Sequence, residues 1–175
     1  VELAGSSSPD IEWVEHALMM LEELGHIYDG FSILRPTSPF RHAETIQRAW
    51  QRFSQVKGAD SIRAVEKCKQ HPGKMWVVQQ RFMTPLLPFA PGGQPWHSSQ
   101  YQALPEIYVQ NASLEMAWTR LVQDGRTIAG EVIMPFFTEG NEGFDINDPD
   151  DWRDAEFLIS EGRALLPDVL HKPYA

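Results

Sequence analysis

Residues 9–68 alternate between helical and strand patterns, and this alternation constrains the fold more than any other feature. Apolar residues recur at helical spacing over about 9–24 and again over about 42–57. A strand-like run follows each of these segments, at 28–34 and at 61–68. Short connections between such elements favour right-handed βαβ crossovers, and therefore a mainly parallel sheet covered by helices. The predicted fold class is α/β.

Residues that favour helix ends lie at the ends of the first and last predicted helices. Ser8 can cap the first helix, with Pro9 in its first turn, and Gly25 suits its end. Asp148 can cap a last helix whose first position holds Pro149. The sequence therefore predicts a helix near each end of the chain.

The middle of the chain, at 71–105, has a different texture. Residues 75–87 could form a hairpin, and residues 88–95 hold too many Pro and Gly for regular structure. We interpret 71–105 as an insertion or arm. Three segments are expected after it: a strand at 106–110, an ambiguous amphipathic stretch at 113–122 and a strand region at 127–137.

Composition and charge exclude several classes of protein. The 175 residues are the usual size of one domain, and 42% of them are hydrophobic, as in a folded globular protein. Lys and Arg number 15 against 24 Asp and Glu, and the net charge of −9 argues against a sequence-independent nucleic-acid binder. The single Cys68 excludes an intrachain disulfide, and no apolar run approaches the roughly 18 residues of a membrane span. We expect one cytoplasmic domain without a nucleic-acid or membrane partner.

Two polar segments could carry chemistry. The RPTSPFR turn (35–41) follows a predicted strand, and its hydroxyl and guanidinium groups could bind phosphate or carboxylate oxygens. In the GFDIN loop (143–147), Asp145 and Asn147 alternate along extended chain, so both could offer oxygen to a hard cation such as magnesium. A capped turn with solvent-facing arginines, and a solvated acid at a strand end, explain the same residues. Helix capping already explains the acids that follow, at 148–151.

Taken together, the segments resemble the acylneuraminate cytidylyltransferase family, whose members make CMP-sialic acid and related CMP-nonulosonates. These motifs carry the resemblance in the family's order and spacing: ELA at 2–4, PTSPFR at 36–41, GADS at 58–61, HPxK at 71–74, LP at 104–105 followed by Asn111, and FDI at 144–146. The resemblance spans almost the whole chain.

The resemblance implies a fold and a reaction. The fold is a Rossmann-like nucleotidyltransferase domain with helices on both faces of the sheet and a small dimerisation arm, which corresponds to the segment at 71–105. The anomeric hydroxyl of a nonulosonic acid attacks the α-phosphorus of CTP and expels pyrophosphate, with Mg²⁺ on the phosphates. Two alternatives stay open: a non-catalytic sugar- or nucleotide-binding module, and a nucleotidyltransferase that uses another nucleotide or sugar.

The resemblance also assigns roles to residues. Asp145 matches the first metal-binding Asp, and Asn147 stands where the second acidic ligand is expected, so both are predicted to be catalytic and to bind the metal. Arg35 occupies the position of a Gln that contacts the acyl sugar. The predicted substrate-binding residues are Arg35, Thr37, Ser38, Lys74, Tyr108, Gln110 and Asn111, and the predicted nucleotide-binding residues are Ser7 and Ser8. Tyr101 replaces a family Arg and Ala112 a family Gly, on the side of the substrate.

The family begins with a strand and a basic loop that holds the CTP phosphates, and the present sequence begins after that loop. We therefore expect a single nucleotidyltransferase domain over 1–175 that lacks its amino-terminal nucleotide-binding part. A sheet without its first strands would expose an unpaired edge, which natural domains avoid. The expected enzyme is accordingly larger than 175 residues.

Overall fold

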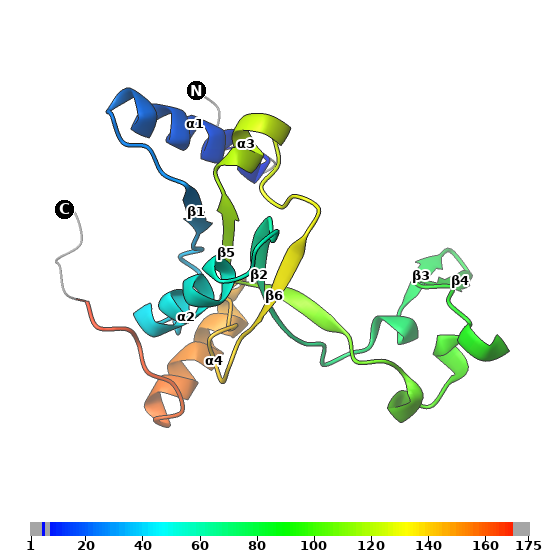
Figure 1. Cartoon of the computed structure of the whole chain (residues 1–175). Coiled ribbons are helices and arrows are strands. Elements are labelled where there is room, and N and C mark those ends of the chain that lie inside the picture. The colour runs from blue at the N-terminus through cyan, green and yellow to red at the C-terminus, as the bar shows by residue number, and fades with distance from the viewer. Residues whose placement is uncertain (1–4, 6–7, 170–175) are drawn as a thin grey trace. The chain divides into compact units, whose positions relative to one another are not determined.

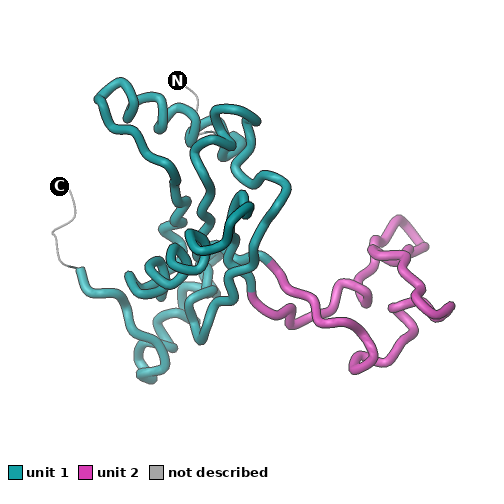
Figure 2. The backbone as a smooth tube through the Cα atoms, viewed as in Figure 1, with its two compact units in different colours: residues 1–65, 110–175 teal, residues 66–109 magenta. Residues whose placement is uncertain are grey.

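The structure is a computed structural model that describes residue 5 and residues 8–169. Its helices and strands are, in order (Figure 1), α1 (Asp10–Glu23), β1 (Gly30–Ile33), α2 (Ala43–Ser54), β2 (Ser61–Lys67), β3 (Trp76–Gln79), β4 (Phe82–Pro85), β5 (Tyr108–Trp118), α3 (Arg120–Gly125), β6 (Ile133–Phe137) and α4 (Pro149–Ser160). They form two compact units. The first comprises the described residues up to 65 and from 110 onward, and the second comprises 66–109 (Figure 2). The segment interpreted as an arm, 71–105, lies within the second unit.

A mixed sheet with the strand order β1-β5-β2-β6 organises the first unit. β1 pairs antiparallel with β5, which places Ile33 opposite Glu115, and β2 pairs parallel with β6. The α/β class is confirmed, but the expectation of a mainly parallel sheet is wrong. No α-helix lies between β2 and β5 in the described chain, and the N–H of Trp118, at the end of β5, donates to the carbonyl of Asp60, just before β2 (3.4 Å). Without a crossover helix, β5 runs back along the sheet.

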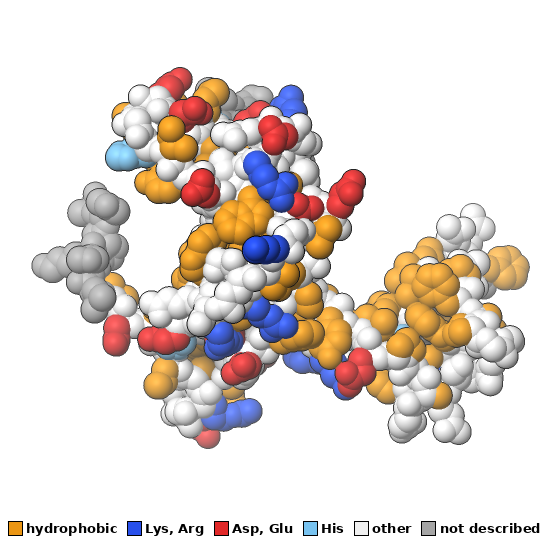
Figure 3. Space-filling view, in the orientation of Figure 1, with side chains coloured by type: hydrophobic (Ala, Val, Ile, Leu, Met, Phe, Trp, Pro, Cys, Tyr) orange, Lys and Arg blue, Asp and Glu red, His pale blue; other side chains and the backbone are white. Residues whose placement is uncertain are grey.

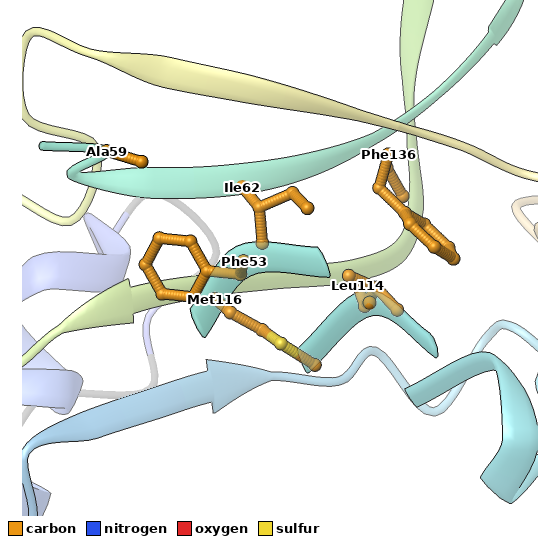
Figure 4. Close-up of a cluster of buried hydrophobic side chains, with 8 residues drawn as sticks. Phe53, Ala59, Ile62, Leu114, Met116 and Phe136 are labelled. Atoms are coloured by element: carbon orange, nitrogen blue, oxygen red, sulfur yellow. The ribbon is translucent and has the colours of Figure 1, made fainter. Parts of the chain in front are cut away.

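Helices cover both faces of this sheet. Phe53 of α2 packs with Ile62, Leu114 and Phe136 in the largest buried cluster, and all four side chains are almost inaccessible to water (Figure 4). On the other face, Val14 of α1 packs with buried residues of β1 and α3. This arrangement follows from the strand period of two, because successive residues of β5 point to opposite faces.

Several predicted boundaries change in the structure. The segments at 106–110 and 113–122 form the single strand β5 and the start of α3, and the strand predicted at 127–137 begins only at residue 133. Ser8 does not cap α1, because its hydroxyl accepts from the N–H of Gly5 (3.2 Å) and Pro9 takes the capping position. The predicted cap of α4 is confirmed: Asp148 accepts from two backbone N–H groups of the first turn in a capping box.

The second unit has no apolar interior of its own. β3 and β4 form an antiparallel hairpin, as predicted for 75–87. Over residues 66–109 only His71 and Gly73 are buried, and neither is a hydrophobic side chain. Hydrophobic side chains instead gather on the surface of this unit in Figure 3, whereas charged side chains gather on the other. None of the helices in the described part of the chain combines the length and the hydrophobicity that a membrane-spanning helix needs.

Candidate functional site

The RPTSPFR turn after β1 and the GFDIN loop before α4 meet in the first unit. The N–H of Ile146 donates to the carbonyl of Thr37 (2.9 Å), and Phe144 packs edge-on against Phe40, with ring centroids 5.4 Å apart. Both rings belong to a cluster that includes Ala155 of α4. The fold thus joins the two segments that the sequence singled out, although about a hundred residues separate them.

Arginine side chains fix the RPTSPFR turn to the sheet. Arg41 donates to the carbonyl of Arg35 (3.0 Å) and to that of Ser113 on β5 (2.5 Å). Burial lowers the pKa of the Arg41 guanidinium, since the charged form loses hydration there. Arg35 in turn forms an ion pair with Asp10 of α1, and one of its contacts measures 3.1 Å. The turn is therefore held from two sides.

Two charged residues of the sheet extend the ion pair between Asp10 and Arg35. The Nη2 atom of Arg35 lies 3.8 Å from Oε1 of Glu115 on β5, and Glu115 forms a further ion pair with Arg63 of β2. The hydrogen bond from Arg35 lowers the pKa of Asp10, and the same bond raises the pKa of Arg35. Burial lowers the pKa of Arg63. The four side chains Asp10, Arg35, Glu115 and Arg63 are named the charge chain below.

Unsatisfied polar atoms lie on both joined segments. One carboxylate oxygen of Asp145 is buried without a hydrogen-bond partner among the described residues, and so is the hydroxyl of Ser38. The negative charge of Asp145 also contributes to the raised pKa of Arg35. A buried polar group without a partner costs free energy, so it often awaits a ligand or ion.

Asp145 fits a magnesium ligand better than Asn147 does. Asn147 is exposed, and its N–H donates to the carboxylate of Asp151 in the cap of α4 (2.8 Å). Within the described chain, no three His, Cys, Asp or Glu side chains gather as a metal cluster. Magnesium commonly takes one or two carboxylates and keeps water or phosphate oxygens, so a single buried carboxylate is compatible with it.

The remaining predicted site residues have identifiable partners. In the second unit, Lys74 donates to the carbonyls of His97 (3.0 Å) and Ser99, and the hydroxyl of Tyr108 donates to Glu106 (3.2 Å). That bond is the main cause of the raised pKa of Tyr108.

In the first unit, Asn111 donates to the hydroxyl of Thr138 (3.0 Å), and Gln110 is exposed at the start of β5. The hydroxyl of Ser8 bonds to Gly5, and Ser7 lies outside the described residues.

Sequence reasoning missed Asp10, Glu115 and Arg63. A signal existed for two of them, because Glu115 stands among apolar residues of β5 and Arg63 among apolar residues of β2. A charged residue inside a strand with buried neighbours requires a partner of opposite charge. No equivalent signal marks Asp10, which resembles an ordinary first-turn acid.

A scan against protein-family models found no match, and a search of curated proteins found none. The chemistry of the site therefore rests on its geometry. The joined turn and loop offer an arginine and buried hydroxyl and carboxylate oxygens, which suit a polar, oxygen-rich ligand with a bound cation.

Proposed function

We propose that this protein is a cytidylyltransferase with a Rossmann-like nucleotidyltransferase fold, which activates a sialic-acid-like nonulosonic acid with CTP and releases pyrophosphate. The observation that carries the proposal is the meeting of the RPTSPFR turn with the GFDIN loop, where Asp145 has a buried oxygen without a hydrogen-bond partner among the described residues. These are two of the segments that resemble the family. A cytoplasmic location is part of the proposal.

In this proposal the protein positions charges and forms no covalent bond of its own. The anomeric hydroxyl of the sugar releases its proton to water as its oxygen forms a bond to the α-phosphorus of CTP, and the bond between this phosphorus and pyrophosphate breaks. Asp145 would hold Mg²⁺ through its free oxygen, with the amide of Asn147 as a weaker, neutral ligand. When bound, the ion supplies charge neutralisation of the triphosphate. Arg35, Thr37 and Ser38 orient the sugar from the RPTSPFR turn.

A specific observation favours the main alternative, a non-catalytic binding module. Asn147 is neutral and exposed, and the described residues hold no cluster of three or more metal-ligating side chains. Such a module would bind sugar or nucleotide without forming product. A third possibility keeps the reaction type and changes the nucleotide or the sugar.

The first experiment measures pyrophosphate release by the protein expressed from its complete reading frame. CTP, GTP, ATP and UTP are each supplied with Mg²⁺ and a panel of nonulosonic acids. We expect turnover with CTP and at least one of these acids. Calorimetric binding without product would favour the binding module, and turnover with another triphosphate would change the assigned nucleotide.

Substitution of Asp145 tests the metal role. Asp145→Asn should lower turnover at least a hundredfold, because it removes the charged oxygen that neutralises the ion. Asn147→Asp should lower the Mg²⁺ concentration for half-maximal rate. Asp154→Asn, an exposed change on α4, is the control. Wild-type turnover by Asp145→Asn, with an unchanged melting curve, would move the metal site elsewhere.

We also propose that the second unit mediates a homodimer. Its hairpin exposes apolar side chains, among them Val78 and Phe82 at 69% and 80% exposure, and a second copy would cover them. Light scattering at micromolar concentration should show a dimer for the wild type and for Gln79→Ser, and a monomer for the double variant Val78→Ser, Phe82→Ser. A wild-type monomer would contradict this proposal.

A further inference from the structure

The charge chain links four elements of the first unit. Asp10 comes from α1, Arg35 follows β1, Glu115 lies on β5 and Arg63 on β2. Glu115 and Arg63 have side chains that are 11% and 14% exposed, whereas Arg35 is 36% exposed. The Glu115–Arg63 end of the charge chain is therefore shielded from water, and Arg35 is its most exposed member.

The charge chain has no excess of positive charge. Two carboxylates face two guanidinium groups within it, and the negative charge of Asp145 also acts on Arg35, so Arg35 has no net positive charge to offer a further ligand. A ligand carboxylate at Arg35 would lie close to the carboxylates of Asp10 and Glu115, and like charges at short range repel strongly where water is limited. A neutral oxygen can accept a hydrogen bond from Arg35 without this repulsion.

The geometry also shows what fixes Arg35. Asp10 accepts from both terminal nitrogens of the guanidinium and from the indole N–H of Trp13 (3.0 Å), so its carboxylate is itself oriented. A guanidinium held in this bidentate manner has a set direction for its remaining donors. Asp10 therefore sets the direction of the Arg35 guanidinium, and Glu115 attracts the same group from 3.8 Å without a hydrogen bond.

We infer that Asp10 and Glu115 are positioning residues that hold Arg35 as a donor to an uncharged oxygen of the substrate, a hydroxyl or amide carbonyl, and that the substrate carboxylate binds elsewhere. This inference rests on the proposed function. It makes Arg35 a determinant of specificity for the neutral part of an acidic sugar.

The first test needs no substrate. Urea unfolding is measured for the wild type, Asp10→Asn, Arg35→Gln and the double variant. We expect the two changes to be coupled by at least about threefold in the unfolding equilibrium constant. Asp124→Asn, an exposed acid on α3, combined with Arg35→Gln is the matched control and should show additive effects. Additivity of Asp10 with Arg35 would overturn the inference whatever the enzyme does.

The second test uses the acid sugar that the wild type turns over. Arg35→Met, which has no donor, should raise the KM for this sugar at least about tenfold with a much smaller change in kcat. Arg35→Gln keeps a neutral hydrogen-bond donor and should therefore raise this KM clearly less than Arg35→Met does. Asp10→Asn should raise the same KM, because it frees the guanidinium. Asp124→Asn is again the control.

Two results separate this inference from the proposed function. If Arg35→Gln is as impaired as Arg35→Met, charge and not hydrogen bonding matters at this position, and the inference is overturned while the function stands. If the wild type turns over no acid sugar, the proposed function and the substrate assignment of Arg35 both fail. Coupling in the unfolding cycle would then support only the charge chain.

Discussion

The two units are stabilised in different ways. In the first, Phe53, Ile62 and Leu114 are completely buried between α2 and the sheet, and burial of apolar area supplies the stability. The second, residues 66–109, buries no hydrophobic side chain and is held by local hydrogen bonds and ring contacts. A unit of the second kind gains little from the hydrophobic effect until another surface covers it.

His71 is the centre of the second unit. Its Nδ1 accepts from the N–H of Gly73 (2.9 Å), so its Nε2 carries the proton and donates to the carbonyl of Pro105 (3.0 Å). The rings of Trp96 and Tyr101 stand edge-on to it, with centroids 5.6 and 6.0 Å away. One polar ring thus takes the place that an apolar core fills in the first unit.

The largest expected effect is a difference in stability between substitutions of two phenylalanines, one in each unit. Phe53→Ala should cost about 3–5 kcal/mol of unfolding free energy, because it leaves a cavity against Trp118 and the sheet. Phe82→Ala, on the exposed hairpin, should cost less than about 0.5 kcal/mol at concentrations where the protein is monomeric. Urea unfolding followed by circular dichroism measures both. Equal costs would mean that the hairpin is buried in the monomer.

An intermediate effect is expected at His71. His71→Gln removes the ring that bonds to both Gly73 and Pro105, and a buried group left without a partner costs about 1–3 kcal/mol. Hydrogen exchange at the Gly73 amide should become faster, while amides of β2 and β5 in the first unit should keep their protection. His16→Gln, on the exposed face of α1, is the matched control. Unchanged exchange at Gly73 would show that the ring does not hold this unit.

The smallest effect is expected on the melting temperature at acidic pH, and it concerns one carboxylate of each unit. Asp60 represents the first unit. The N–H of Val132, the guanidinium of Arg120 and the N–H of Glu131 lower the pKa of Asp60 to about 2. A lowered pKa means that ionised Asp60 stabilises the fold above its ordinary pKa of 3.8, and that this contribution is lost as the pH falls towards 2. Asp60→Asn should therefore flatten the dependence of the melting temperature on pH between about 4 and 2.

Glu106 in the second unit provides the comparison for Asp60. Its pKa is also lowered, chiefly by a hydrogen bond from Lys67, but both side chains are more than half exposed. Water and salt screen such a pair. Glu106→Gln should therefore change the dependence of the melting temperature on acidic pH less than Asp60→Asn does. If Glu106→Gln has the larger effect, local ion pairs contribute more to the second unit than its exposure implies.

Local signals predicted the elements well and their pairing less well. The periodicity of residues 9–68 predicted α1, β1, α2 and β2, and Asp148 with Pro149 predicted the start of α4. The length of β5 was missed, because residues 113–122 combine apolar and polar positions that fit either a helix or a strand. The direction of β5 depends on which strand it meets, and that is a property of distant residues.

In the candidate site, likewise, the residue types were predicted and their partners were not. Arg35 and Ser38 were predicted because their turn follows a strand-like segment and carries guanidinium and hydroxyl groups, and Asp145 because it alternates with Asn147 along an extended segment. Their partners were not, because Asp10 and Glu115 are 25 and 80 positions away from Arg35 in the chain. The sequence by itself determined local structure and the chemical groups available. Only the tertiary structure decided which charges face one another, because ion pairs and strand pairing arise from contacts between segments that no local pattern relates.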